Sequence, residues 1–343
     1  MKDDERINAV FNSWQLERFC RAFHVAAEEL EVVFSGWHKI SIMSSDRVFL
    51  IPRAPQNVRR LGRELSFYEW IDGRSPVPMP HLITRLRDRM ISSYEIGVVS
   101  RLPGVPFARR MLDIDAHQRA EFLARLAAVT AAWHDIATVD LPAALFSRPP
   151  SPSGRLTTAT WHRRVLMPGF TAHAVSFIYR FVRRLAAGRA LPGMLEKETE
   201  TLRLWTEACA ELAALSPVLL HGDVHEHHVM VEPESLSILG IVDWETVRIG
   251  NPVWDFNFGE WGTAVCQWWS ALPELRAEMW TRYLRARGLA VRRREGLNLF
   301  FTLWDLLWMV HARRTTGHIV TGTDYRTAVE IHLEKLAGVT ARL

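Results

Sequence analysis

Residues 221–231, HGDVHEHHVMV, concentrate side chains that can do chemistry, with four histidines and two acids in eleven residues. An apolar run, VLL at 218–220, precedes them, and HVMVE at 228–232 alternates between the two faces of a strand. PES then predicts a turn, after which SILGIVDWE at 237–245 forms a second apolar run. The pattern predicts a loop followed by a β-hairpin.

A hairpin brings its two open ends together, so His228 and Asp243 are expected to lie close in space. Asp223 stands five residues before His228 on the loop and can reach the same pocket. One of these groups is a candidate base and two are candidate metal ligands. Such a set suits phosphoryl transfer, in which Mg²⁺ neutralises the phosphates and a carboxylate orients the attacking hydroxyl.

The histidines also permit a second interpretation, a zinc site. His225, His227 and His228 have a spacing that a zinc ion accepts, and Asp223 can add a ligand. No cysteine lies near them, and the phosphoryl-transfer interpretation already explains the aspartates. We therefore treat His225 and His227 as loop residues.

Composition limits the class of protein. The chain has 343 residues, of which 48% are hydrophobic and 23% charged, which suits two globular domains or lobes. The first ten residues, MKDDERINAV, contain no apolar stretch, so we expect no secretory signal, and no apolar run reaches the roughly 18 residues of a membrane span. We expect a cytoplasmic protein with reduced cysteines, since the three present show no paired spacing: Cys20, Cys209 and Cys266.

Basic residues are mostly arginine, because the chain has four lysines: Lys2, Lys39, Lys197 and Lys335. The net charge of +4 is mild, and the arginine-rich segments lack the interleaved aromatic residues of a nucleic-acid binder. We therefore expect neither a nucleic-acid nor a membrane partner. The oligomeric state stays open.

The periodicity predicts a small β-rich N-terminal lobe followed by a large helical C-terminal lobe. Strands are expected at 31–51, 91–100 and 218–243. Helices are expected at 14–31, 58–71, 121–136, 173–187, 194–215 and within 263–343.

Several segments together resemble the aminoglycoside phosphotransferase family. HGDVHEHHV is similar to its catalytic loop HGDxHxxN, and IVDWE to its metal-binding segment. NPVWDF, VFLIPR, RLPGVP and WHDI resemble further family segments, in the family's order, over roughly residues 30–260. The resemblance implies an α+β, protein-kinase-like bilobal fold. Its nucleotide-binding lobe would span 1–99, and its catalytic and substrate-binding lobe 100–343.

The resemblance also assigns roles. Asp223 matches the catalytic base, Asp243 the main Mg²⁺ ligand, and Glu64 the acid that pairs with the lysine holding the triphosphate. His221 and Asp255 match positions that brace the catalytic loop.

The nucleotide base would be held by the backbone of the hinge that follows the N-terminal lobe. In the family pattern this hinge falls on Ser100 to Leu102. The donor would be ATP or GTP with Mg²⁺, or with Mn²⁺.

Two departures from the family pattern matter. His228 replaces the asparagine at the second metal position, a change that resembles macrolide kinases of the superfamily. Leu50 replaces the cation of the third strand. Lys39 on the preceding strand or Arg53 can supply that charge, and we favour Lys39, because Pro52 indicates that the strand ends before Arg53.

The acceptor site is expected among the C-terminal helices, with Glu260, Trp261 and Asp305 as candidate contacts. The expected activity is O-phosphorylation of a small molecule that resembles an antibiotic, as in antibiotic resistance. Because the chain is net basic, a macrolide or nucleoside is favoured over a polycationic aminoglycoside. The alternative is a pseudokinase that binds a ligand or protein without phosphoryl transfer, which Leu50 favours.

Overall fold

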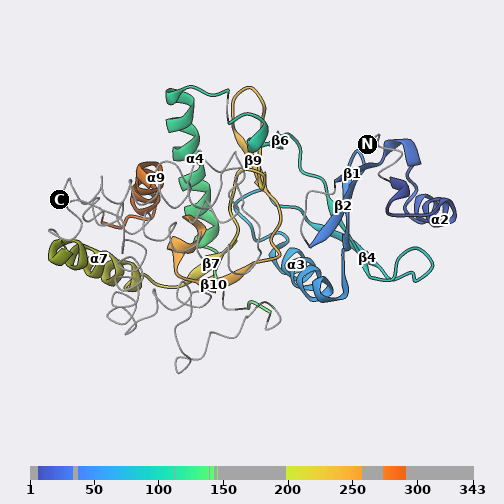
Figure 1. Cartoon of the computed structure of the whole chain (residues 1–343), viewed down its shortest axis with the longest axis horizontal. Coiled ribbons are helices and arrows are strands. Elements are labelled where there is room, and N and C mark those ends of the chain that lie inside the picture. The colour runs from blue at the N-terminus through green and yellow to red at the C-terminus, as the bar shows by residue number, and fades with distance from the viewer. Residues whose placement is uncertain are drawn as a thin grey trace, which may run out of the picture. The chain divides into compact units, whose positions relative to one another are not determined.

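The computed structural model describes residues 7–33, 38–111, 113–138, 140–142, 145, 198–256 and 273–290 (Figure 1). The chain divides into two compact units. The first contains residues 1–109, 136–146 and 227–248, and the second contains 110–135, 147–226 and 249–343. The hairpin after the catalytic-loop motif thus groups with the N-terminal residues. The lobe boundary after residue 99 stays a prediction.

The first unit is built on an antiparallel sheet of five strands in the order β1-β2-β3-β5-β4. The strands are β1 (Glu31–Val33), β2 (Lys39–Met43), β3 (Arg47–Pro52), β4 (Leu82–Leu86) and β5 (Ile96–Ser100). The strands predicted within 31–51 and 91–100 are confirmed. β4 was not predicted, because two of its five side chains are exposed and it contains Arg85.

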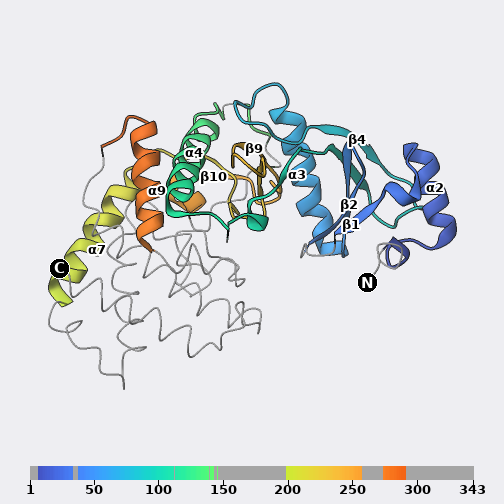
Figure 2. The same cartoon turned by 90° about the horizontal axis from the view of Figure 1, so that it is seen from above.

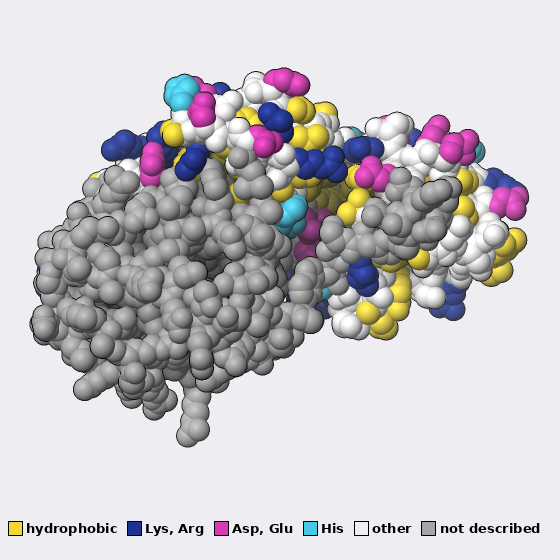
Figure 3. Space-filling model, turned by 45° about the horizontal axis from the view of Figure 1, so that its top comes forward, with side chains coloured by type: hydrophobic (Ala, Val, Ile, Leu, Met, Phe, Trp, Pro, Cys, Tyr) yellow, Lys and Arg dark blue, Asp and Glu magenta, His cyan; other side chains and the backbone are white. Residues whose placement is uncertain are grey.

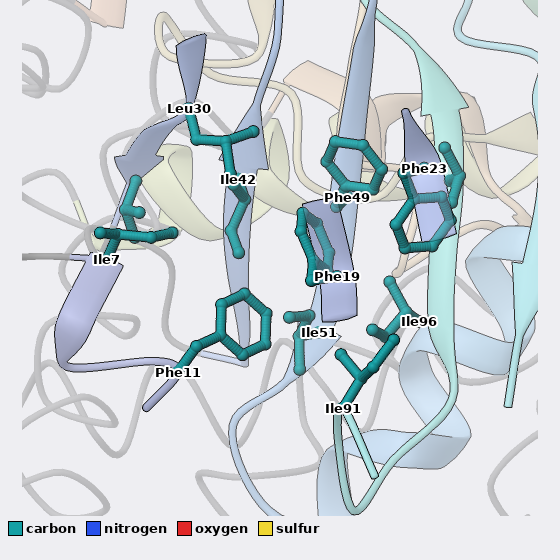
Figure 4. Packing of buried hydrophobic residues seen from close by; sticks show 12 residues of the cluster. Ile7, Phe11, Phe19, Phe23, Leu30, Ile42, Phe49, Ile51, Ile91 and Ile96 are labelled. Carbon is teal, nitrogen blue, oxygen red and sulfur yellow. The ribbon is translucent and has the colours of Figure 1, made fainter. Parts of the chain in front are cut away.

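An aromatic cluster covers one face of this sheet (Figure 4). Phe19 and Phe23 of helix α2 (Ser13–Phe23) pack on Phe49 of β3, with ring centroids 4.8 Å apart in both pairs. The helix begins with a capping box between Asn12 and Gln15. The prediction of one helix over 14–31 is wrong, because His24 adopts the left-handed conformation that ends a helix.

Helix α3 (Val58–Ile71) covers the opposite face and follows a short 3₁₀ turn, Pro55–Asn57. Its bounds agree with the predicted helix over 58–71. Leu65 fills the space in which a Cβ on Gly97 would lie, so only glycine at this β5 position allows the close approach. Leu50 pairs directly with Gly97, which places it on the α3 side of the sheet.

A smaller sheet completes the first unit, in the order β6-β8-β9. Its strands are β6 (Val105–Pro106), β8 (Val229–Val231) and β9 (Ile238–Ile241), and a 3₁₀ turn, Phe107–Arg109, follows β6. β8 and β9 are antiparallel, which confirms the predicted hairpin.

The second unit is mainly helical in its described part. Helix α4 (Ala116–His134) lies beside α9 (Pro273–Ala286), as Figure 2 shows from above. The remaining elements are α7 (Glu198–Ala213), β7 (Val218–Leu220), β10 (Arg248–Gly250, whose first residue belongs to the first unit) and the 3₁₀ turn Pro252–Phe256. The helix predicted at 173–187 lies outside the described residues.

Aromatic rings pack the 3₁₀ turn Pro252–Phe256 against α9, and Tyr283 of α9 also meets His134 of α4 with ring centroids 5.3 Å apart. Phe256, Trp280 and Tyr283 are buried, with ring centroids 4.9–5.1 Å apart. Among the described helices, none combines the length and the apolar character required to cross a bilayer. Acidic and basic side chains are interspersed over the described surface visible in Figure 3.

Candidate active site

A buried lysine is the centre of the polar site in the first unit. The Lys39 ammonium, at the start of β2, donates hydrogen bonds to Glu64 of α3 and to Asp243 Oδ1, the latter at 2.9 Å. Glu245 Oε2 lies 3.8 Å away. One cation is therefore set among three carboxylates, and the side chain of Lys39 is only 8% exposed.

Strand register explains why Lys39 reaches this position. Lys39 pairs with Pro52 and Ser41 pairs with Leu50, so Lys39 lies on the same face of the sheet as Leu50. This is the α3 face, on which Glu64 is buried. The expectation that a neighbouring strand can present a cation on the face of Leu50 agrees with this register.

Arg53, the other candidate cation, is exposed just beyond the end of β3. Its backbone N–H donates to the His38 carbonyl at 3.0 Å, and its Nε lies 3.5 Å from the Lys39 carbonyl oxygen. Arg53 thus contacts the backbone of Lys39, whereas the Lys39 side chain contacts the carboxylates of Glu64 and Asp243.

Glu64 is fixed by two donors. Lys39 donates to one carboxylate oxygen, and the Tyr68 hydroxyl, one helical turn later, donates to the other at 2.9 Å. Burial raises the pKa of both Glu64 and Tyr68. Burial alone would lower the pKa of Lys39, but the charges of Asp243, Glu64 and Glu245 outweigh it and raise that pKa. The ammonium therefore stays charged at neutral pH.

Replacing Tyr68 by Phe is expected to lower the free energy of unfolding by about 1–3 kcal/mol, because it leaves one buried Glu64 oxygen without its donor. Urea denaturation of the two proteins measures the difference. Tyr94→Phe serves as a control, because it removes the hydroxyl group of a tyrosine that is not fully buried. Equal stability of Tyr68→Phe and the parent protein would contradict the importance of this hydrogen bond.

Asp243 follows β9 in a strained backbone conformation, with φ of 67°. Trp244 beside it stacks on Phe67 of α3 with ring centroids 4.7 Å apart, and its Nε1 donates to the Ile241 carbonyl at 3.1 Å. These contacts anchor the segment that carries Asp243 against α3.

His228 lies at the open end of the hairpin, beside Asp243. Its Nε2 is 3.4 Å from Asp243 Oδ2, and its carbonyl accepts a hydrogen bond from the Val242 N–H at 3.0 Å. The predicted proximity of His228 and Asp243 is thus confirmed.

The donor atoms around Asp243 fit a divalent cation. Carboxylate oxygens of Glu64, Asp243 and Glu245 lie within 4.8 Å of one another, but the Lys39 ammonium already lies among them. Because Lys39 donates to Asp243 Oδ1, the Asp243 oxygen that faces His228, Oδ2, is the candidate metal ligand. Burial raises the pKa of Glu245 to about 7, although Lys39 opposes the shift. Oxygen is the ligand that Mg²⁺ prefers, and His228 adds a nitrogen on the side of Asp243.

Asp223 lies in the second unit, on the loop after β7. Its backbone N–H donates to His221 Nδ1 at 3.2 Å, and its Oδ2 is 3.9 Å from His225 Nε2. Asp255 fixes the backbone of this loop, because its carboxylate accepts hydrogen bonds from the His221 N–H at 2.8 Å and the Gly222 N–H at 2.6 Å. His221 and Asp255 are both buried.

Asp255 also connects this loop to the helices. The same carboxylate lies 3.2 Å from Trp133 Nε1 and 3.0 Å from His134 Nε2, both on α4. The other His134 nitrogen lies 2.9 Å from the Tyr283 hydroxyl of α9. Burial alone would raise the pKa of Asp255, but the hydrogen bond and charge of His134 lower it. Burial lowers the pKa of His134 itself.

This pair predicts acid sensitivity of the second unit. Both groups have a lower pKa in the folded state than in the unfolded state, so the unfolded state binds more protons as the pH falls. The stability that each group contributes is therefore fully present above its ordinary pKa, ~6.5 for His134 and ~3.9 for Asp255, and is lost as the pH falls below it. His134→Gln keeps a donor towards Asp255 but cannot titrate. We expect the melting temperature of this variant to fall less between pH 7 and pH 5.5 than that of the parent protein. Equal pH dependence would contradict the role of His134.

The predicted hinge already uses part of its backbone. The Ser100 N–H donates to the His81 carbonyl at 3.0 Å, and the Arg101 N–H donates to the Asp46 carbonyl at 2.9 Å. A Cβ on Gly240 would meet the side chain of Leu102 and the carbonyl of Pro78, so there is no room for a side chain at position 240. The N–H groups of Ser100 and Arg101 are thus engaged, and among the predicted hinge residues Leu102 is the candidate for an N–H contact to a nucleotide base.

The predicted acceptor contacts Glu260, Trp261 and Asp305 lie outside the described residues. Sequence reasoning assigned no role to Tyr68, Glu245 or His134, although Glu245 and His134 lie in IVDWE and WHDI, which resemble segments of the family. The first had a signal, since Tyr68 follows Glu64 by four residues and so shares its helix face. The partners of Glu245 and His134 lie on other elements, so only the tertiary contacts reveal their roles.

The chain matches a known protein family over most of its length. Residues 35–296 match the model of the phosphotransferase enzyme family. A search of curated proteins finds no match.

Solved structures are similar at low identity. The streptomycin–ATP complex of APH(2")-IIa aligns with a TM-score of 0.56 and 13% identity, covering 96% of this chain and 98% of the other. The GDP complex of aminoglycoside 2'-phosphotransferase-IIIa aligns at 0.54 and 14%, covering 94% and 96%. The macrolide 2'-phosphotransferase MphH from Brachybacterium faecium aligns at 0.52 and 17%, covering 92% and 96%. These likenesses confirm the predicted α+β, kinase-like fold.

Proposed function

Because the chain belongs to the phosphotransferase enzyme family, we propose that it moves the γ-phosphoryl group of a nucleoside triphosphate onto a hydroxyl group of a small molecule. The observation that carries the proposal is the buried ion pair of Lys39 with Glu64, next to Asp243. A lysine held by a helix acid beside a metal-binding aspartate is the arrangement that phosphoryl transfer requires in kinases.

The side chains divide the work. Lys39, oriented by Glu64, binds oxygens of the triphosphate, and the Leu102 backbone contacts the base. Asp243 and His228 hold Mg²⁺ or Mn²⁺, which supplies charge neutralisation at the phosphates when bound. Asp223 orients the acceptor hydroxyl and takes its proton. The hydroxyl oxygen then bonds to the γ-phosphorus as the bond to the β-phosphate oxygen breaks, and the nucleoside diphosphate leaves.

The donor is ATP or GTP, and two of the similar structures described above contain ATP or GDP. For the acceptor we favour a molecule that resembles an antibiotic. The net charge of +4 disfavours a polycationic aminoglycoside relative to a macrolide or nucleoside.

A pseudokinase was the alternative, because Leu50 stands where the family has a cation. That observation no longer favours it, since Lys39 lies on the same face and pairs with Glu64. The proposal is tested by thermal shift with ATP and GTP, each with and without Mg²⁺, followed by an assay of nucleotide turnover with candidate acceptors. If neither nucleotide raises the melting temperature, the proposed function is wrong.

The metal ligands give a sharper prediction. Asp243→Ala is expected to abolish the Mg²⁺-dependent part of nucleotide binding, because it removes the main oxygen ligand. His228→Asn restores an amide oxygen and should bind Mg²⁺–nucleotide at least as tightly as the parent protein. Titration of nucleotide at several Mg²⁺ concentrations measures both. Unchanged metal dependence in Asp243→Ala would exclude Asp243 as a ligand.

A further inference from the structure

Four arginines gather around the first two turns of α3. Arg59, Arg60 and Arg63 lie on that helix, and Arg248 begins β10. Residues three and four apart are neighbours on a helix, so Arg63 lies beside both Arg59 and Arg60. Burial lowers the pKa of Arg63, and the charges of the other three arginines lower it further. Arg248 follows Glu245 by three residues, and Glu245 Oε1 lies 3.5 Å from Arg60, so the fold brings Arg248 near the arginines of α3 although more than 180 residues of sequence separate them.

Glu245 supplies the carboxylate that opposes the charge of this cluster, but it also contacts other cationic side chains. Glu245 Oε1 lies 3.5 Å from Arg60 and 3.8 Å from His38 Nε2, and its Oε2 lies 3.8 Å from Lys39. Glu245 also attracts Arg63 electrostatically. One carboxylate thus faces several cations, which leaves the cluster with an excess of positive charge.

Within the described part of the chain, the Arg63 side chain also lacks a hydrogen-bond acceptor for one of its nitrogen atoms. This atom, Nε, is buried. A buried donor without an acceptor destabilises a fold, so such a group requires an explanation. An oxygen of a bound ligand would satisfy it.

We propose that Arg60, Arg63 and Arg248 form a binding site for an oxyanion, a phosphoryl or carboxylate group. Guanidinium groups bind such groups through paired hydrogen bonds, and several of them together compensate more than one negative charge. Glu245 contacts both Arg60 and Lys39, so the site adjoins the ammonium group assigned to the triphosphate.

Two sources can supply the oxyanion: the terminal phosphate of the nucleotide, or an acidic group of the acceptor. The choice between them rests on the proposed function, whereas the binding of an oxyanion does not. In either case the cluster repels a polycationic acceptor, which favours a neutral or acidic one.

The experiment uses inorganic pyrophosphate as the probe, with the ionic strength matched by NaCl. Calorimetric titration compares the parent protein with Arg60→Gln, Arg63→Gln and the double variant. Arg21→Gln is the matched control, because it removes an exposed arginine of α2 that pairs with Glu17 in the same unit. We expect each single variant to weaken pyrophosphate binding by about tenfold, the effect of one charge-assisted contact. Arg21→Gln should bind as the parent does.

Two readouts separate this result from a loss of folding. Without pyrophosphate, Arg63→Gln should melt no lower than the parent protein, because removing this arginine relieves like-charge repulsion. Arg60→Gln also loses the ion pair with Glu245 and is therefore compared at a temperature where both proteins are folded. Arg63→Lys keeps the charge but not the paired donors, and should bind more weakly than the parent and more tightly than Arg63→Gln. Equal pyrophosphate affinity in the parent and the double variant, or no binding by the parent, would overturn the proposal.

Nucleotide titrations then identify the source. If the oxyanion is the terminal phosphate, the double variant loses ATP or GTP affinity while ADP or GDP affinity is kept. If nucleotide affinities are unchanged and pyrophosphate binding is lost, the site belongs to an acidic acceptor. A protein that binds no nucleotide disproves the proposed function, while the pyrophosphate comparison still decides the oxyanion site.

Discussion

Replacing Asp223 by Asn is expected to lower the turnover number by a factor of about 100 or more, the low end for loss of a general base. Nucleotide binding should persist, because Asn keeps the shape of the side chain and the loop is held through the backbone. Asp255 accepts from the N–H groups of His221 and Gly222, and the Asp223 N–H donates to His221, so none of these contacts uses the Asp223 carboxylate.

Steady-state assays with an accepted substrate measure the effect, and calorimetric titration with nucleotide checks binding. Glu207→Gln on α7 provides a control, since it removes one partly exposed carboxylate from the same unit. Turnover of Asp223→Asn close to that of the parent protein would show that another group accepts the proton.

Lys39→Met is expected to impair both stability and nucleotide binding. It leaves Glu64, Asp243 and Glu245 without their shared cation, and loss of one partner of a buried ion pair costs about 3–5 kcal/mol of unfolding free energy. The apparent KM for the nucleotide should rise by about tenfold or more, as expected for loss of one charge-assisted phosphate contact. Chemical denaturation and initial-rate kinetics measure the two effects.

A double variant separates these two roles of the lysine. Lys39→Met with Glu64→Gln removes a buried charge of each sign, so part of the stability should return while the KM stays high. Arg53→Ala should raise the KM less than Lys39→Met does. If Lys39→Met lowers stability but leaves the KM unchanged, the lysine is structural and another cation holds the phosphates.

The sequence by itself determined the local elements that carry the site. Apolar residues at three- and four-residue steps predicted helix α3 with its observed bounds, and alternation around a turn predicted the β8–β9 hairpin. Because a hairpin joins its ends, the proximity of His228 and Asp243 followed from chain geometry alone. The ordered family segments predicted the kinase-like fold in the same way.

Only the tertiary structure decided which groups meet across elements. The sequence favoured Lys39 over Arg53 from the position of Pro52, but only the register of β2 with β3, which no local pattern encodes, places Lys39 beside Glu64. Likewise, the pairing of Asp255 with His134 and the gathering of Arg248 with the arginines of α3 join residues more than 100 positions apart. Periodicity reports which face of its own element a residue occupies. Its partner on another element depends on how the elements pack, and that is a property of the whole fold.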